Sequence, residues 1–228
     1  EFRRVLFRSS IDFGPETRID AVLRSRIEAQ KPVGENRNYT AAYLGSLYPE
    51  KRIDFLIRAC DQIIKRSPHF RLIIIGDGPQ RSMVMDLARE RPYVNLVGLC
   101  LGEVKSEYLL SVDIVLNPGL IGLSVLDSFA HALPVVTRNL AYHSPEIVYL
   151  EHEKNGLILD GDELIYAREV IDLLENEERL HRMRVEALKT ASKYSVDAMA
   201  DEFTFGIVKC LESDSFGARK DASKTLLP

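Results

Sequence analysis

Apolar residues along this chain follow two patterns, short runs rich in β-branched residues and longer stretches with helical spacing. Residues 71–75 (Arg-Leu-Ile-Ile-Ile) form a run typical of a buried strand, and the stretch before Ser67-Pro68 repeats its apolar positions every three or four residues. The two patterns alternate from Asn38 onward. This alternation predicts an α/β fold, a Rossmann-like parallel sheet with helices on both faces.

The predicted strands and helices follow one another in turn along the chain. The strands are expected at residues 39–48, 71–75, 94–97, 113–116, 133–136 and 157–159. Helices are expected at 53–67, after Pro79, through 108–110, at 123–132, and over a largely helical region from 162 to 211.

The two ends of the chain lack this pattern. Residues 1–9 are basic, carry no turn or capping signal and resemble translated adapter DNA, so we exclude them from the predicted fold. Residues 10–37 include one stretch, 19–29, compatible with a helix, and we interpret them as a linker with a helix remnant. Residues 212–228 are expected to be a flexible tail. The predicted domain therefore covers 38–211.

Composition narrows the class of protein. A chain of 228 residues, 46% of them hydrophobic, can bury one sizeable core. Its net charge of −4 and scattered arginines do not predict a nucleic-acid partner. Cys60, Cys100 and Cys210 lack metal or redox spacing, and no apolar run approaches the roughly 20 residues that span a bilayer. We expect a cytoplasmic domain without a transmembrane segment, with peripheral membrane attachment left open for a full-length protein.

Candidate chemistry lies just after each strand, because open parallel sheets bind ligands beyond the carboxyl ends of their strands. After the first strand, Lys51 and Arg52 are adjacent cations before a helix, and Lys51 is suited to a phosphate. Local composition alone would make both of them solvated loop charges. Gly76-Asp77-Gly78-Pro79 lacks the third glycine of a dinucleotide fingerprint, so it predicts a tight turn between a strand and a helix.

A glycine-containing loop after the fourth strand, residues 117–123, leads into a helix. Unpaired amides at such a place bind anions, so a diphosphate could lie against Gly122 and Leu123. Asp127 could accept hydrogen bonds from two ribose hydroxyls, or could simply complement the helix dipole.

Neither paired carboxylates nor a cluster of metal ligands stands out in the sequence. His143-Ser144-Pro145-Glu146 predicts an ordinary helix start, with a serine cap, a proline and an acid in the first turn. We therefore assign His143 no catalytic role and expect no metal site and no resident cofactor.

Taken in order, several of these stretches resemble glycosyltransferase family four, in its nucleotide-sugar-binding C-terminal domain. They are Gly45–Lys51, Gly76–Pro79, Gly119–Asp127, Ala132–Val136, Glu146-Ile147 and Asn155-Gly156. The resemblance implies one half of a GT-B glycosyltransferase, which transfers a sugar from a UDP-sugar or GDP-sugar to an acceptor hydroxyl with retention of configuration and without a metal. The glycan or lipid acceptor would be held by an N-terminal domain missing from this chain, which we expect to be an incomplete fragment.

The resemblance also implies roles for individual residues. Lys51 would contact the donor diphosphate and act in catalysis by stabilising the leaving group, while backbone near Gly98 would touch the base and Asp127 would hold the ribose. The loop amides would contact the sugar or its phosphates. The full set of expected donor-binding residues is Ser46, Lys51, Arg52, Gly98, Gly119, Ile121, Gly122, Leu123 and Asp127.

Three positions depart from the family pattern. Ser46 stands where an arginine is usual, and Arg52 could take its place. Gly119 and Asp127 stand where two glutamates meet the sugar and the ribose, and aspartate is shorter by one carbon–carbon bond, about 1.5 Å. These departures leave open a non-catalytic nucleotide-binding module, or another GT-B enzyme such as a sugar-nucleotide epimerase.

Overall fold

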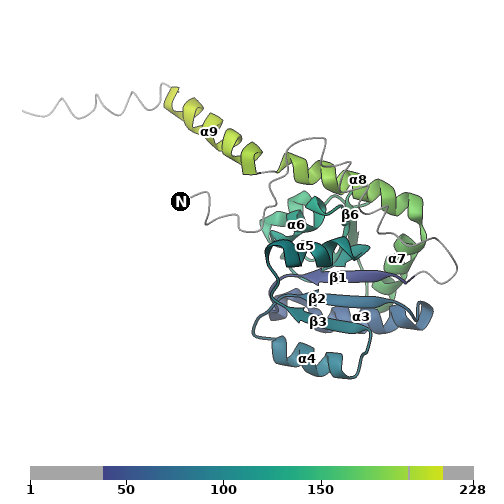
Figure 1. Cartoon of the computed structure of the whole chain (residues 1–228). Coiled ribbons are helices and arrows are strands. Elements are labelled where there is room, and N and C mark those ends of the chain that lie inside the picture. Colours follow the sequence, from purple (N-terminus) through teal and green to yellow (C-terminus); the bar gives the residue numbers. More distant parts are fainter. Residues whose placement is uncertain (1–37, 195, 213–228) are drawn as a thin grey trace, which may run out of the picture. The chain divides into compact units, whose positions relative to one another are not determined.

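The computed structural model describes residues 38–194 and 196–212, and its centre is a parallel sheet with helices on both faces (Figure 1). The predicted linker with its helix at 19–29, the excluded residues 1–9 and nearly all of the predicted tail lie outside the described residues. The expected fold class is therefore observed in the part of the chain that carried the alternating pattern.

Six strands form the sheet, in the order β3-β2-β1-β4-β5-β6, and every pairing between neighbours is parallel. Their bounds are β1 (Thr40–Leu44), β2 (Arg71–Ile75), β3 (Val94–Gly98), β4 (Ile114–Leu116), β5 (Val135–Arg138) and β6 (Gly156–Leu159).

Two strand predictions need correction at their ends. The first strand stops at Leu44 rather than at residue 48, because the chain turns at Gly45, whose φ is +149°. The fifth begins two residues later than predicted, because the amide of Leu133 still bonds to the carbonyl of Ser128 in the turn that closes the preceding helix.

The helices alternate with the strands as predicted. They are η1 (Pro49–Lys51), α3 (Ile53–Arg66), α4 (Arg81–Arg89), α5 (Gly102–Leu110), α6 (Ser124–Ala130), η2 (Pro145–Tyr149), α7 (Glu163–Glu175), α8 (Glu177–Lys193) and α9 (Val196–Glu212). The chain divides into two compact units between Ser192 and Lys193. The predicted domain extended to residue 211, past this division, and α9 belongs to the second unit.

The two faces of the sheet have separate cores. On β1, Ala41 and Tyr43 join a cluster with residues of α3 and α7, whereas Ala42 and Leu44 join a second cluster with residues of α5 and α6. Figure 1 shows α5 and α6 on one side of the sheet and α3 and α4 on the other. Because alternate side chains point to opposite faces, burial of both faces explains the continuous apolar runs of the strands.

The loops after β1 and β2 are joined through their backbones. The amide of Gly45 bonds to the carbonyl of Ile75, and that of Leu47 to the carbonyl of Asp77, both at 3.0 Å. A Cβ added to Gly78 would lie 2.7 Å from the amide nitrogen of Leu47, and Gly76 is packed still more tightly against Gly45. The structure thus supports the interpretation of Gly76–Pro79 as a tight turn.

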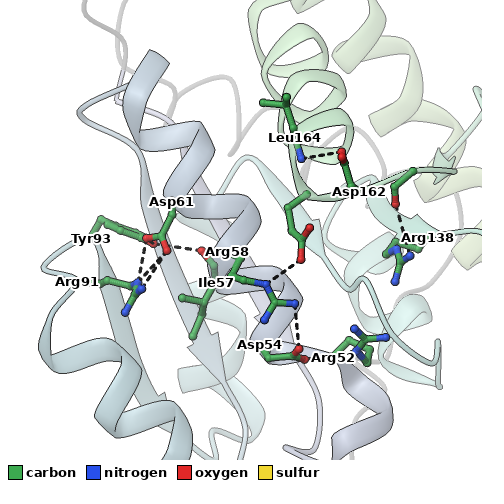
Figure 2. A network of polar contacts seen from close by, with 12 residues as sticks. Arg52, Asp54, Ile57, Arg58, Asp61, Arg91, Tyr93, Arg138, Asp162 and Leu164 are labelled. Atoms are coloured by element: carbon green, nitrogen blue, oxygen red, sulfur yellow. Dashed lines mark hydrogen bonds and ion pairs between the residues drawn. The ribbon is translucent and has the colours of Figure 1, made fainter.

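Ion pairs connect α3 to α7 and to the segment before β3 (Figure 2). Arg91 donates to both carboxylate oxygens of Asp61 on α3, and the hydroxyl of Tyr93 donates to the same carboxylate at 2.5 Å. Arg58, also on α3, bonds to Glu163 of α7 at 2.8 Å. Partial burial acts to raise the pKa of Asp61, but hydrogen bonds from Arg91 and Tyr93 outweigh it and hold this pKa below its usual value.

Asp61→Asn should lower the free energy of unfolding at neutral pH by about 1–3 kcal/mol, because it removes charge-assisted hydrogen bonds. A carboxyl whose pKa is depressed by folding stabilises the protein above its unfolded pKa and loses that contribution as the pH falls through its folded pKa. Urea unfolding at neutral and acidic pH should therefore show a difference from the wild type that shrinks in acid. Asp86→Asn, at an exposed pair with Arg89, is the control and should change little.

Candidate active site

The loops after β1 and β4 meet where the strand order reverses. The chain passes from β1 outward to β2 and β3, then returns to β4 on the other side of β1. A crevice at the carboxyl ends of the strands is expected at such a switch point. The amide of Leu120 bonds to the carbonyl of Glu50 at 3.0 Å, so the two loops are in direct contact there.

Gly119 is the point of closest approach between these loops. A Cβ added at this position would lie within 2.5 Å of the Cα of Lys51, and closer still to the carbonyl oxygen of Glu50. Because the obstacles are backbone atoms, they cannot move aside as a flexible side chain could. The glycine that departs from the family pattern is therefore a requirement of this packing, and the usual glutamate side chain has no room here.

Lys51 lies over the loop that follows β4. Its Nζ donates to the carbonyl of Leu120 at 2.5 Å, and a Cβ added to Gly122 would lie 3.5 Å from the same Nζ. Burial lowers the pKa of Lys51 below its ordinary value, while the negative charges of Glu146 and Glu50 act in the opposite direction. The half-buried ammonium is thus held beside the loop residues that the sequence predicted to bind phosphate.

The amides of the loop after β4 differ in what they can bind. Those of Leu120 and Ile121 already donate within the protein, to Glu50 and to His143. Within the described part of the chain, no backbone acceptor is assigned to the amides of Gly122 and Leu123. Among the predicted loop amides, these two therefore have no assigned backbone partner in the described part of the chain, whereas Ile121 contributes by fixing the loop.

His143 fixes that loop through both of its ring nitrogens. Nε2 lies 2.7 Å from the carbonyl oxygen of Arg138, which requires a proton on Nε2, and Nδ1 accepts from the amide of Ile121 at 3.3 Å. The sequence predicts no catalytic role for His143 and carries no signal that its ring would face Ile121.

The predicted helix start beside His143 is only partly observed. Pro145 begins η2, which is a short 3-10 helix, and the side chain of Ser144 makes no capping hydrogen bond. The loop before η2 is therefore held by the hydrogen bond between Nε2 of His143 and the carbonyl of Arg138, and not by a serine cap.

Asp127 lies in the first turn of α6 and is paired with a lysine that the sequence analysis did not single out. Its Oδ2 is 3.0 Å from Nζ of Lys105 on α5, and the two side chains are 15% and 6% exposed. Burial raises the pKa of Asp127 above its usual range, and the Lys105 ammonium offsets this only in part. The sequence gave no signal for Lys105, because it is one of many charged helix residues and meets Asp127 only where α5 packs beside α6.

The remaining predicted residues are more scattered. Ser46 is exposed, and its carbonyl accepts a hydrogen bond from Tyr43. Arg52 has a left-handed backbone, with φ of 53°, and its Nε faces Asp54 at 3.4 Å, as Figure 2 shows. Gly98, with φ of +79°, accepts from the amide of Gly76 at the end of β3. The structure thus turns Arg52 toward its own helix rather than placing it as a replacement for a cation at Ser46.

Among the described residues, no group of three or more His, Cys, Asp or Glu side chains is placed to hold a metal ion. None of the described helices is long and apolar enough to cross a bilayer.

Comparison with known families gives this arrangement a context. Residues 38–176, more than half of the 228-residue chain, match the model of the family described as glycosyl transferases group 1. The chain belongs to this family. The match begins at the first residue of the predicted domain and ends just after α7, so it includes both loops of the candidate site.

Several curated relatives of this group 1 domain are named as enzymes that transfer a sugar. The alpha-monoglucosyldiacylglycerol synthase of Acholeplasma laidlawii is 26% identical over 171 residues, which are 72% of this chain and 42% of that protein. A GDP-mannose-dependent phosphatidylinositol monomannoside mannosyltransferase of Mycobacterium tuberculosis is 28% identical over 158 residues, 63% of this chain and 40% of that protein. The chain therefore spans less than half the length of either relative.

Solved structures share the fold of the group 1 domain. Pneumococcal O-GlcNAc transferase GtfA with UDP and GlcNAc has a TM-score of 0.66 at 19% identity, covering 79% of this chain and 37% of that one. Anabaena HepE with UDP and glucose has a TM-score of 0.63 at 17% identity, covering 86% of this chain and 53% of that one. The predicted fold, one half of a GT-B glycosyltransferase, is confirmed.

Gly119→Ala should destabilise the domain by about 1–3 kcal/mol, because the added methyl group meets backbone atoms of the η1 turn. Urea unfolding measures this loss. Gly122→Ala is the matched control, since its Cβ would make only an ordinary contact with Nζ of Lys51, at 3.5 Å. Equal stability of the two variants would contradict the close approach described here.

Proposed function

We propose that this chain binds the donor of a retaining glycosyltransferase, a nucleoside diphosphate sugar with uridine or guanosine as its base. The observation that carries the proposal is the contact of Lys51 with the loop after β4, where its Nζ bonds to the carbonyl of Leu120 and lies beside Gly122 at the switch point. Similar structures contain UDP, and one relative is named for its dependence on GDP-mannose. The proposal therefore includes both uridine and guanosine as the base of the donor.

In this proposal the domain stabilises the leaving group. Negative charge that develops on the departing diphosphate meets the Lys51 ammonium and the two loop amides, which His143 and Glu50 hold in place before the donor arrives. Preorganised donors of this kind lower a barrier without a general acid or a metal ion. The sugar passes to an acceptor hydroxyl of a glycan or lipid, bound by a second domain that closes the cleft and excludes water.

Further donor contacts in the proposal are Asp127 with the ribose and backbone near Gly98 with the base. The domain is proposed to work in the cytoplasm, in line with its widely spaced cysteines. Calorimetry with UDP and with GDP tests the central claim, and no binding of either nucleotide at millimolar concentration would refute it.

A non-catalytic nucleotide-binding module is the second candidate, and it is favoured by the packing at Gly119, which excludes the side chain that meets the sugar in the family pattern. The two candidates differ in turnover. If UDP or GDP binds but no nucleotide sugar is consumed when an acceptor domain and acceptors are supplied, the module is correct; glycosylated product supports the transferase.

Lys51→Met should weaken UDP by roughly 1.5–3 kcal/mol, about ten- to a hundredfold in Kd, because a charge-assisted hydrogen bond to phosphate is lost. Uridine, which has no phosphate, should bind as before. Calorimetry with both ligands measures the difference. Arg52→Gln is the matched control, and we expect a smaller loss because this guanidinium faces Asp54. Equal losses of UDP and uridine would remove Lys51 from the phosphate site.

Glu146→Gln should make UDP binding more sensitive to alkaline pH. The Glu146 carboxylate raises the pKa of Lys51 against the lowering effect of burial, so without it Lys51 loses its proton at a lower pH. At neutral pH the variant should bind UDP as well as the wild type or better, because one negative charge near the phosphates is gone. The ratio of variant to wild-type affinity should then fall as pH rises. This ratio cancels the titration of UDP itself, and a constant ratio would contradict the coupling.

A further inference from the structure

A buried ion pair joins the two helices that follow β3 and β4. Lys105, on α5, and Asp127, on α6, are 3.0 Å apart, and their side chains are 6% and 15% exposed. Both helices cover the same face of the sheet, and each begins beyond the carboxyl end of a strand. The pair therefore lies near the carboxyl ends of the strands, where a ligand of this fold is expected.

A contribution to the stability of the fold does not by itself explain this ion pair. Removing two charges from water costs several kcal/mol for each ion, and well-packed apolar side chains are often as stabilising or more so. The surrounding cluster already contains such side chains, with Leu109 on α5 and Val125 and Phe129 on α6. Apolar residues at 105 and 127 would extend this cluster, so the retained charges call for another role.

Hydrogen-bonding capacity remains on both partners. Asp127 uses Oδ2 for the pair, and the described contacts assign no donor to its Oδ1. The ammonium of Lys105 has three N–H groups, and Asp127 is the one acceptor that the described residues provide for them. An acceptor and a donor thus lie side by side, a combination that neither residue offers alone.

We propose that Lys105 is a specificity-determining residue that, together with Asp127, recognises the ribose hydroxyls of the donor. This inference rests on the proposed function. A vicinal diol has hydroxyls that both donate and accept, so one can donate to Oδ1 of Asp127 while the oxygen of the other accepts from Lys105. The lysine also supplies a contact that the aspartate, with its short side chain, does not reach alone.

The test compares UDP with 2′-deoxy-UDP and 3′-deoxy-UDP by calorimetry, or the corresponding guanine nucleotides if GDP is the ligand. The unmodified chain should bind the ribonucleotide about tenfold more tightly than at least one of the analogues. In Lys105→Met the ribonucleotide should weaken about tenfold while that analogue changes little, so the preference disappears. Lys51→Met, a phosphate-side control, should weaken all three ligands alike and keep the preference.

A preference that survives in Lys105→Met would overturn the inference, and so would equal weakening of all ligands, which a merely structural role predicts. If Lys105→Met does not fold because Asp127 is left buried without its partner, Asp127→Asn is compared with Lys105→Met/Asp127→Asn, which leaves no buried charge at either position. The double variant should lose the preference that Asp127→Asn retains, and equal preference in the two would overturn the inference. Binding without any preference in the unmodified chain overturns this inference alone. No binding of UDP or GDP overturns the proposed function as well.

Discussion

Backbone contact between the loops after β1 and β4 is the constraint on which the candidate site depends. Gly119 lies so close to Glu50 and Lys51 that no side chain fits between them. The contact exists because the sheet places β4 directly beside β1, although 69 positions separate the residues of the Lys51–Leu120 hydrogen bond. The phosphate contacts proposed for the donor follow from this docking, since it positions Lys51 and orients the following loop.

The docking also divides the loop into a supporting part and a part that can meet a ligand. Leu120 and Ile121 direct their amides into the protein, toward Glu50 and His143, and Gly122 and Leu123 follow at the turn into α6. A fixed loop costs little reorganisation when charge develops nearby, which is the condition for electrostatic stabilisation of a leaving group. His143 thus contributes as a support of the loop rather than as an acid or base.

Ion pairs in this domain differ in their surroundings, and the difference separates structural pairs from candidate functional ones. Asp61 and Arg91 are partly exposed, and Asp61 accepts hydrogen bonds from both Arg91 and Tyr93, so folding favours the charged carboxylate. Lys105 and Asp127 are more deeply buried, and burial raises the pKa of the aspartate despite the lysine. The first arrangement joins α3 to the start of β3, whereas the second keeps unused hydrogen-bonding groups close to the strand ends.

The sequence by itself determined the order and kind of most elements, because burial on two sheet faces imposes continuous apolar runs and helix burial imposes a repeat of three to four residues. It also determined Lys51 and the glycine loop as candidates, since both follow strands. It could not locate strand ends set by turn hydrogen bonds, as at Leu133, nor decide which cations face the site. Arg52 turns to Asp54 at the start of its own helix, whereas Lys105 reaches Asp127, and His143 supports Ile121, only after distant segments are packed together. Those contacts depend on distances between elements, and local sequence does not encode them.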